Sequence, residues 1–232
     1  MKKLILLSLT LIMVTAQANA QFFVGAKAGL IVSTFTEVYM PTPHISYRAG
    51  VSGGYMLSPK LGIESGIYMK QIGIEDSEGY MPAIDRPSVD TRTHIPAVYF
   101  EMPLSLLYKI SIADNVKIRF NGGIYAAYGS YGNGYYTYYP DGVNRSGAGL
   151  GTFEDCYSSG DEGFIAPHTV EAANRLDYGL TFGIGIEAAG INVSANYDFG
   201  LANVYDVFYF HPESKNIKNR AYWIAVGYNF KL

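Results

Sequence analysis

The segment 176–201 limits the possible folds more than any other part of the chain, because apolar and polar residues alternate along both of its arms. Such a repeat of two residues indicates β-strands, since successive side chains of a strand point to opposite faces. The apolar face of the first arm carries Leu176, Tyr178, Leu180, Phe182, Ile184 and Ile186, and that of the second carries Ile191, Val193, Ala195, Tyr197, Phe199 and Leu201. The pattern predicts a β-hairpin with its turn at 188–190.

The opposite face of this hairpin is rich in glycine and carries Asp177, Glu187 and Asp198. Glycines and charges suit the inside of a narrow barrel whose apolar face is turned to lipid. Each arm has at least the ~9–11 residues that a tilted strand needs to cross a bilayer. We therefore expect a transmembrane β-hairpin.

The start of the chain is typical of a secretory signal peptide. Lys2 and Lys3 precede an apolar run over 4–14, and small residues at Ala18 and Ala20 precede Gln21. The apolar run is too short for the ~20 residues of a membrane-spanning helix, which argues against an anchor. We expect cleavage after Ala20, with 1–20 removed and 21–232 forming a single barrel domain.

The remaining chain repeats the strand pattern. With the hairpin arms 176–187 and 191–201, strands are predicted at 22–35, 47–57, 60–72, 93–109, 116–129 and 219–232, with a kink at Pro103. Long connections at 36–46, 73–92, 130–173 and 203–218 alternate with short turns, and 131–139 is predicted to extend the fifth strand. This predicts an all-β, eight-stranded, antiparallel up-and-down transmembrane β-barrel with short periplasmic turns and long extracellular loops.

Composition agrees with export to an outer membrane. The chain has 21 Tyr and 26 Gly at a mean hydropathy of +0.07, as expected of such barrels. The net charge of −3 leaves no basic excess for nucleic acid, so no nucleic-acid partner is predicted. The single cysteine, Cys156, cannot form an internal disulfide, and its role stays open.

The inward faces of the predicted strands collect charges of both signs. An eight-stranded lumen is only wide enough for side chains to fill, so these charges must be paired or hydrated. We expect a salt-bridged plug, with a narrow charge-lined conduit as the alternative. The predicted network contains Lys27, Arg48, Glu64, Lys70, Glu101, Lys109, Lys117, Arg119, Arg175, Asp177, Glu187, Asp198 and Lys231.

Three segments resemble strands of the PorT-like, OmpA-like outer-membrane β-barrel family of Bacteroidota. They are 98–109 (VYFEMPLSLLYK), 122–129 (GGIYAAYG) and 175–187 (RLDYGLTFGIGIE). The resemblance covers most of the mature chain and implies an eight-stranded barrel in the Gram-negative outer membrane. It also implies an alternative role as an accessory component of secretion or envelope assembly, because PorT itself is associated with protein secretion.

The carboxy-terminal segment resembles the signal that the outer-membrane assembly machinery reads. Gly227 precedes two spaced hydrophobic residues, Phe230 and Leu232. An ordinary barrel-closing strand would carry the same residues, and the last position of the signal is more often aromatic. The assembly machinery is nevertheless an expected partner, together with outer-membrane lipid.

The long connections contain the remaining candidates for chemistry. The histidines His44, His94, His168 and His211 show no spacing typical of a catalytic triad. The acids Asp141, Glu154, Asp155, Asp161 and Glu162 lack the spacing of a calcium loop. We assign no catalytic, cofactor-binding or metal-binding residue and expect no cofactor.

Tyrosines gather just after the fifth predicted strand, at Tyr131, Tyr135, Tyr136, Tyr138 and Tyr139. They suit an aromatic girdle at the membrane interface, or a recognition face for an envelope protein or a glycan. We expect a non-enzymatic barrel with a structural, adhesion or recognition role through its extracellular loops. A narrow pore and an enzyme site at the rim are weaker alternatives.

Overall fold

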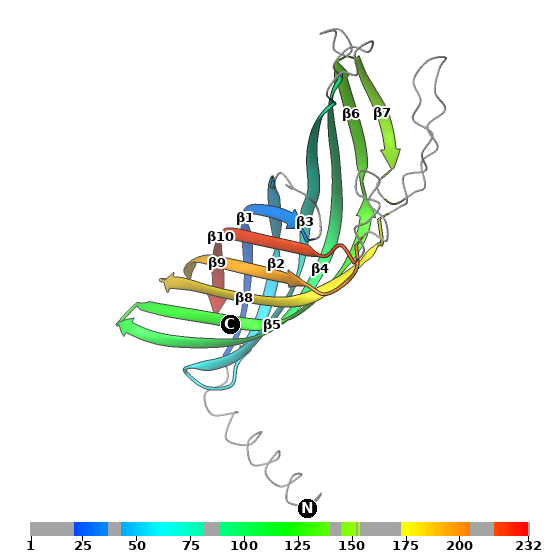
Figure 1. Cartoon of the computed structure of the whole chain (residues 1–232). Helices are drawn as coiled ribbons and strands as arrows, with labels where there is room; N and C mark the ends of the chain where they lie inside the picture. Colours follow the sequence, from blue (N-terminus) through cyan, green and yellow to red (C-terminus); the bar gives the residue numbers. More distant parts are fainter. Residues whose placement is uncertain are drawn as a thin grey trace, which may run out of the picture.

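A computed structural model describes residues 21–36, 43–80, 89–139, 145–151, 153, 173–204 and 216–231, with backbone only within 74–95 and 133–151. Eight antiparallel strands form a closed barrel, because β1 pairs with both β2 and β10 and β3 pairs with β4 (Figure 1). They are β1 (Gln21–Phe35), β2 (His44–Met56), β3 (Leu61–Tyr80), β4 (Val89–Ala113), β5 (Val116–Tyr131), β8 (Leu176–Ala188), β9 (Ile191–Gly200) and β10 (Asn219–Lys231). No helix in the described part of the chain is long and apolar enough to cross a membrane.

The apolar faces of the strands point out of the barrel, as the alternation predicts. Phe182 is 50% exposed and Phe230 is 58% exposed, and neighbouring strands present Leu30, Val51 and Leu104 in the same way. The polar faces point inward, where most charged side chains are buried. An exposed apolar belt of this kind around a polar interior is the arrangement of a barrel that sits in lipid.

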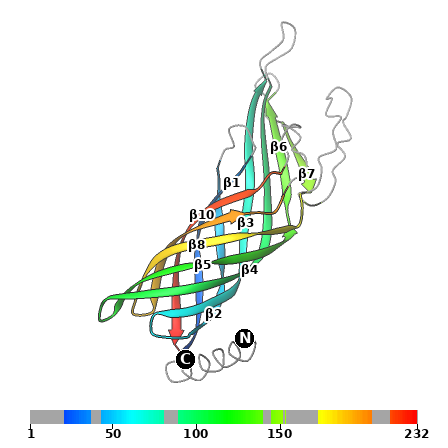
Figure 2. The same ribbon diagram turned by 60° about the horizontal axis from the view of Figure 1, so that its bottom comes forward.

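The turns at one end of the barrel are short. In the β8–β9 turn, Ala188 pairs with Ile191, and Ala189 and Gly190 have φ values of 49° and 87°. Two successive positive φ values fit the two-residue hairpin turn whose twist matches that of the strands. The beginning of β1, the end of β10 and these turns share one end of the barrel (Figure 2), which is the periplasmic end in barrels of this type.

The predicted loop at 73–92 is wrong for most of its length. β3 runs to Tyr80 and β4 starts at Val89, and the two pair in one unbroken register from Leu61–Tyr108 to Tyr80–Val89. The sequence gives no alternation here because a ribbon beyond the membrane has water on both faces and needs no apolar side. The backbone ladder nevertheless continues past the barrel.

The prediction that 131–139 extends the fifth strand is confirmed, with a bulge at the junction. The pairing of β5 with β4 shifts by one residue between Val98 and Tyr99, and Ser130 Oγ donates to the Val98 carbonyl at 3.1 Å. β6 (Asn133–Tyr139) then continues along β4 in the shifted register, and β7 (Arg145–Gly151) adds to β6. β7 lies within the predicted long connection 130–173 and was not expected as a strand.

Pro103 interrupts the β3–β4 ladder without changing its register. Paired residues are found at Ser65–Leu104 and next at Tyr68–Glu101, because proline has no N–H to donate. The hydroxyl of Ser65 donates to the Pro103 carbonyl at 2.7 Å. This side chain supplies a hydrogen bond at the weak point of a ladder that lipid surrounds.

Replacing Ser65 with alanine is expected to lower the free energy of unfolding by about 1 kcal/mol, because the Pro103 carbonyl loses its hydroxyl donor. Urea unfolding in lipid vesicles, followed by the fluorescence of Trp223, measures the change. S111A is the matched control, since Ser111 is exposed. Equal effects of the two substitutions would show that the Ser65 bond contributes nothing.

Candidate functional site

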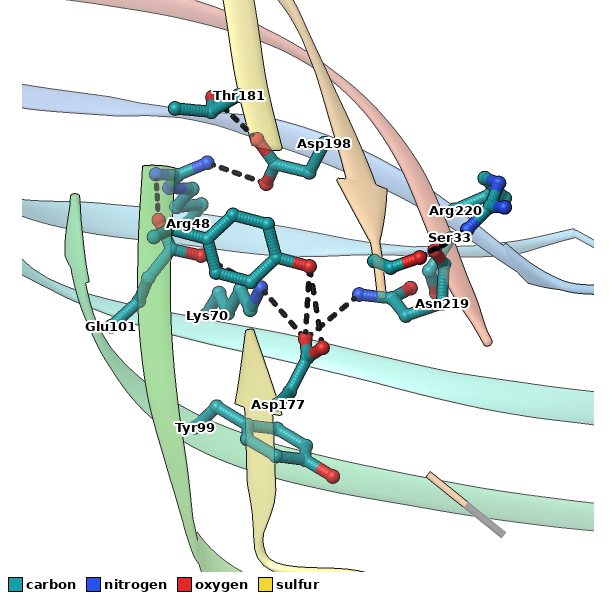
Figure 3. Close-up of polar contacts among 12 residues, drawn as sticks. Ser33, Arg48, Lys70, Tyr99, Glu101, Asp177, Thr181, Asp198, Asn219 and Arg220 are labelled. Carbon is teal, nitrogen blue, oxygen red and sulfur yellow. Dashed lines mark hydrogen bonds and ion pairs between the residues drawn. The ribbon is translucent and has the colours of Figure 1, made fainter. Parts of the chain in front are cut away.

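The middle of the lumen is organised around Arg48 of β2 (Figure 3). Its guanidinium donates to Asp198 Oδ2 at 3.0 Å and to Glu101 Oε1, and therefore joins β9 and β4 across the barrel. The guanidinium carbon also lies 3.9 Å from the centre of the Trp223 ring. Arg48, Glu101 and Asp198 are nearly inaccessible to solvent. A buried arginine contacted in this way is held by charge, hydrogen bonds and an aromatic face together.

Lys70 of β3 lies beside this group and extends it to β8. Its ammonium is 2.7 Å from Glu101 Oε2 and 3.5 Å from Asp177 Oδ2, and it lies 4.4 Å from the centre of the Tyr125 ring. Asp177 also accepts hydrogen bonds from the Tyr125 hydroxyl and from Asn219 Nδ2, each at 3.3 Å. The contacts converge on Asp177 in Figure 3. Glu101 thus connects two cations, which makes the group a network and not a set of isolated pairs.

A second ionic group lies closer to the periplasmic end. Glu64 receives Lys27 on one carboxylate oxygen and Arg119 Nη2 on the other, at 2.8 Å for the latter. Lys109 pairs with Glu187 at 2.7 Å. These contacts connect β1, β3 and β5 in the first case and β4 and β8 in the second.

The buried charges of the lumen balance in sign. Two clusters of buried apolar side chains accompany the charged layer: Phe23, Met56 and Leu107 toward the periplasmic end, and a larger cluster that includes Phe35 and Ile72. The buried ionic side chains are Lys27, Arg48, Lys70, Lys109 and Arg119 against Glu64, Glu101, Asp177, Glu187 and Asp198. A neutral and paired interior favours a packed plug over a water-filled conduit.

Three of the predicted network residues lie outside this buried layer. Lys117 is half-buried and Lys231 is exposed, and both line a cavity at the periplasmic mouth. Arg175 precedes β8, where its guanidinium donates to the Gly129 carbonyl at 3.1 Å and faces the Phe153 ring. The prediction placed all three inward because the alternation of inward and outward side chains was assumed to hold up to the ends of the strands. At the strand ends, an inward side chain lies beyond the packed lumen.

Several interior partners were not singled out in the sequence. Tyr68 and Trp223 flank Arg48, while Thr181 donates to Asp198 at 2.7 Å. Tyr125 and Asn219 donate hydrogen bonds to Asp177. The alternation of the strands already places each of these residues on the inward face. The predicted network contained charged residues only, so it lacked the aromatic, hydroxyl and amide groups that complete it.

A sheet projects from the end of the barrel opposite the short turns (Figure 1). It consists of the distal parts of β3 and β4 with β6 and β7, paired in that order. Tyr131 lies at its base and is 64% exposed. Tyr135, Tyr136, Tyr138 and Tyr139 belong to β6, and of these the structure describes the backbone alone.

The remaining candidate residues are placed by the structure only in part. His44 is buried at the start of β2, and His94 lies in β4 where only backbone is described. Among the described residues, no group of three or more His, Cys, Asp or Glu side chains could hold a metal ion. The signal segment 1–20 and Leu232 fall outside the described residues, as do Cys156, His168, His211 and the acids Asp141, Glu154, Asp155, Asp161 and Glu162.

The residues of the carboxy-terminal motif that are described belong to β10. Phe230 points outward, and Gly227 pairs with Lys27 of β1, whose side chain would collide with a Cβ at position 227. Glycine at this position therefore has a packing reason within the closed barrel. A role as an assembly signal stays a prediction.

Replacing Lys70 with methionine is expected to lower the free energy of unfolding by about 3–5 kcal/mol, since Glu101 and Asp177 lose their shared cation. Urea unfolding in vesicles measures the loss, with the exposed turn residue Lys60 replaced by methionine as the control. The double variant K70M/E101Q should lose less than the sum of its single variants, because the two side chains interact. Strict additivity would contradict the proposed network.

Comparison with known proteins places this architecture in a family. The family model for the outer membrane protein β-barrel domain matches residues 15–206. No curated protein matches the sequence.

Similar solved structures include neisserial surface protein A, with 13% identity, a TM-score of 0.43, and 91% of this chain and 99% of that chain covered. OprG from Pseudomonas aeruginosa has 12% identity and a TM-score of 0.41, with 91% and 97% covered. Ail from Yersinia pestis has 10% identity and a TM-score of 0.37, with 91% and 99% covered. With a family match over most of its length, the chain belongs to the outer-membrane β-barrel proteins.

Proposed function

We propose that the protein is a closed, non-enzymatic outer-membrane barrel that acts in adhesion or recognition through its extracellular part. The observation that carries this proposal is the sheet of β3, β4, β6 and β7, which continues beyond the barrel on the side away from the short turns (Figure 1). Long connections of such barrels face the cell exterior. An extracellular position of this sheet supports the proposal that it contacts an envelope protein or a glycan.

The packing of the lumen supports a scaffold in preference to a pore. Arg48 and Lys70 fill the middle of the barrel and contact carboxylates from β4, β8 and β9. Opening a path for ions would require these pairs to separate inside a low-dielectric interior, which is costly. Rigid cross-links through the lumen instead hold the barrel as a fixed base for the projecting sheet.

Tyrosine supports the recognition role over a purely structural one. Tyrosine side chains provide large contact areas with little loss of conformational entropy, and four of them follow one another closely in β6. Tyr131, at the base, is exposed. The residues of a membrane girdle would surround the barrel at the interface. The four tyrosines of β6 instead lie along one strand that pairs with the extension of β4 beyond the barrel.

A PorT-like accessory role in secretion or envelope assembly is the alternative, and it uses the same surface with a protein partner. It rests on the resemblance of 98–109, 122–129 and 175–187 to that family. Removal of 1–20 after export and reading of Gly227, Phe230 and Leu232 by the assembly machinery belong to either proposal. The identity of a captured partner would separate them.

In planar lipid bilayers, the purified barrel is expected to show no stable open channel, because paired charges and apolar side chains fill the lumen. Current recordings over a range of voltages test this, with protein-free detergent added as the control. A reproducible large conductance would refute the plug and favour the conduit.

Removing the projecting sheet is expected to abolish partner binding while the barrel stays folded. The variant joins Ile74 to Ile95, which are directly paired, through an Asn-Gly turn, and replaces 133–172 with a short Gly-Ser linker. A pulldown from native envelopes compares it with the intact barrel, and heat-modifiable mobility on gels confirms folding. A matched variant with the tyrosines of β6 changed to serine tests their share of the binding. Unchanged partner binding by the trimmed barrel would contradict the recognition role.

A further inference from the structure

A cavity of about 290 Å³ opens at the periplasmic mouth of the barrel. It is surrounded by the first residues of β1, the β2–β3 turn at Ser58 and Pro59, and the last residues of β10. The buried apolar residues Phe23 and Met56 form part of its wall. The cavity therefore lies on the periplasmic side of Arg48 and Lys70, and it shares the Lys109–Glu187 pair with the buried ionic layer.

The wall of this cavity carries an excess of positive charge. Lys109, Lys117 and Lys231 line it together with a single carboxylate, that of Glu187. Lys109 is paired with Glu187 at 2.7 Å, whereas neither Lys117 nor Lys231 lies within ion-pairing distance of a carboxylate among the described residues. On the adjoining turns, Lys60 and Asp114 add one charge of each sign. The mouth thus attracts an anion.

A hollow of about 340 Å³ lies on the outer face of the barrel, beside the same rim. Gly53 lacks a side chain there: a Cβ at this position would find its nearest neighbour, the Phe23 carbonyl oxygen, at 3.7 Å. Exposed apolar side chains surround the gap, among them Val24, Ile63 and Leu104, together with the half-buried Tyr55. Because this face is turned to lipid, a hydrocarbon chain is the natural group to fill it.

The two features adjoin each other. Phe22 and Phe23 line both the cavity and the hollow, with Phe22 on the outer face and Phe23 on the inner one. A lipid of the periplasmic leaflet has its headgroup at the level of this rim and its acyl chains directed toward the membrane centre. The hollow runs the same way, from Phe22 at the rim toward Gly53 and Leu104.

We propose that this rim binds a phospholipid of the periplasmic leaflet with an anionic headgroup. Its phosphate lies against Lys117 and Lys231, and one acyl chain fills the hollow over Gly53. The site selects by charge at the mouth and by shape on the outer face. A lipid that merely surrounds the barrel would show no preference for an anionic headgroup and no dependence on the hollow. A free phosphate would bind through the lysines alone.

Native mass spectrometry of the full barrel, titrated with phosphatidylglycerol or phosphatidylcholine, measures the binding. Phosphatidylglycerol is expected to bind roughly tenfold more tightly, because two lysines near a membrane surface act on its charge. The variant K117Q/K231Q should bind both lipids with similar affinity. G53L should weaken both lipids, since its side chain occupies the hollow.

G122L is the matched control for G53L. Gly122 also faces outward, and a Cβ there would meet only Phe182 at 3.5 Å, yet it lies on β5 away from the hollow. G122L should bind phosphatidylglycerol as the unaltered barrel does. Heat-modifiable mobility confirms that each variant is folded, and the lysine variant provides a test that does not depend on G53L.

Three results would overturn the proposal. Equal binding of both lipids by the unaltered barrel would show that the mouth does not read the headgroup, and equal effects of G53L and G122L would show that the hollow holds no chain. Glycerol phosphate serves as a further probe. If it displaces phosphatidylglycerol at equal concentration, the site recognises a phosphate alone and the acyl chain contributes nothing.

Discussion

The structure depends on the absence of water around the middle of the sheet. Backbone N–H and C=O groups that face lipid must find partners within the protein, so a membrane-spanning sheet has to close on itself. Pairing of β1 with β10 over thirteen residues completes that closure. The same requirement explains why Ser65 adds a hydroxyl donor beside Pro103, where proline removes one N–H from the ladder. Closure also determines where side chains lie, since it separates a lipid-facing surface from an interior that is narrow enough for side chains to fill.

The interior of such a barrel has to contain its own counter-charges. Arg48 and Lys70 would each be unstable in a low-dielectric lumen without the carboxylates that face them from the opposite wall. Because Asp198 belongs to β9 and Asp177 to β8, these contacts run across the barrel and not along neighbouring strands. Glu101, shared by both cations, couples the two contacts. Such cross-links oppose flattening of the cylinder, which backbone pairing alone does not prevent.

The fold could be predicted largely from the sequence because one physical rule acts on all membrane strands alike. Alternation places Lys70, Glu101 and Asp177 inside and Phe182 outside without any knowledge of pairing. It does not say that Lys70 meets Asp177, which is 107 residues away, since that contact depends on the order and tilt of the strands. Alternation also fails beyond the membrane. The distal parts of β3 and β4 were therefore predicted as a loop, and β7 was not expected as a strand.

The two ends of the barrel are under different constraints, and this difference connects the lumen to the proposed recognition surface. At the periplasmic end the chain reverses in two-residue turns such as Ala189–Gly190, so little chain remains there beyond the rim. At the other end the β3–β4 ladder continues in unbroken register past the barrel, and β6 follows the bulge at Ser130 onto the same ladder. A projecting sheet joined in this way inherits its orientation from β4, whose Glu101 is fixed by Arg48 and Lys70. One continuous strand thus joins the ion network to the projecting sheet, so a rigid lumen would favour the proposed recognition role by fixing the base of that sheet.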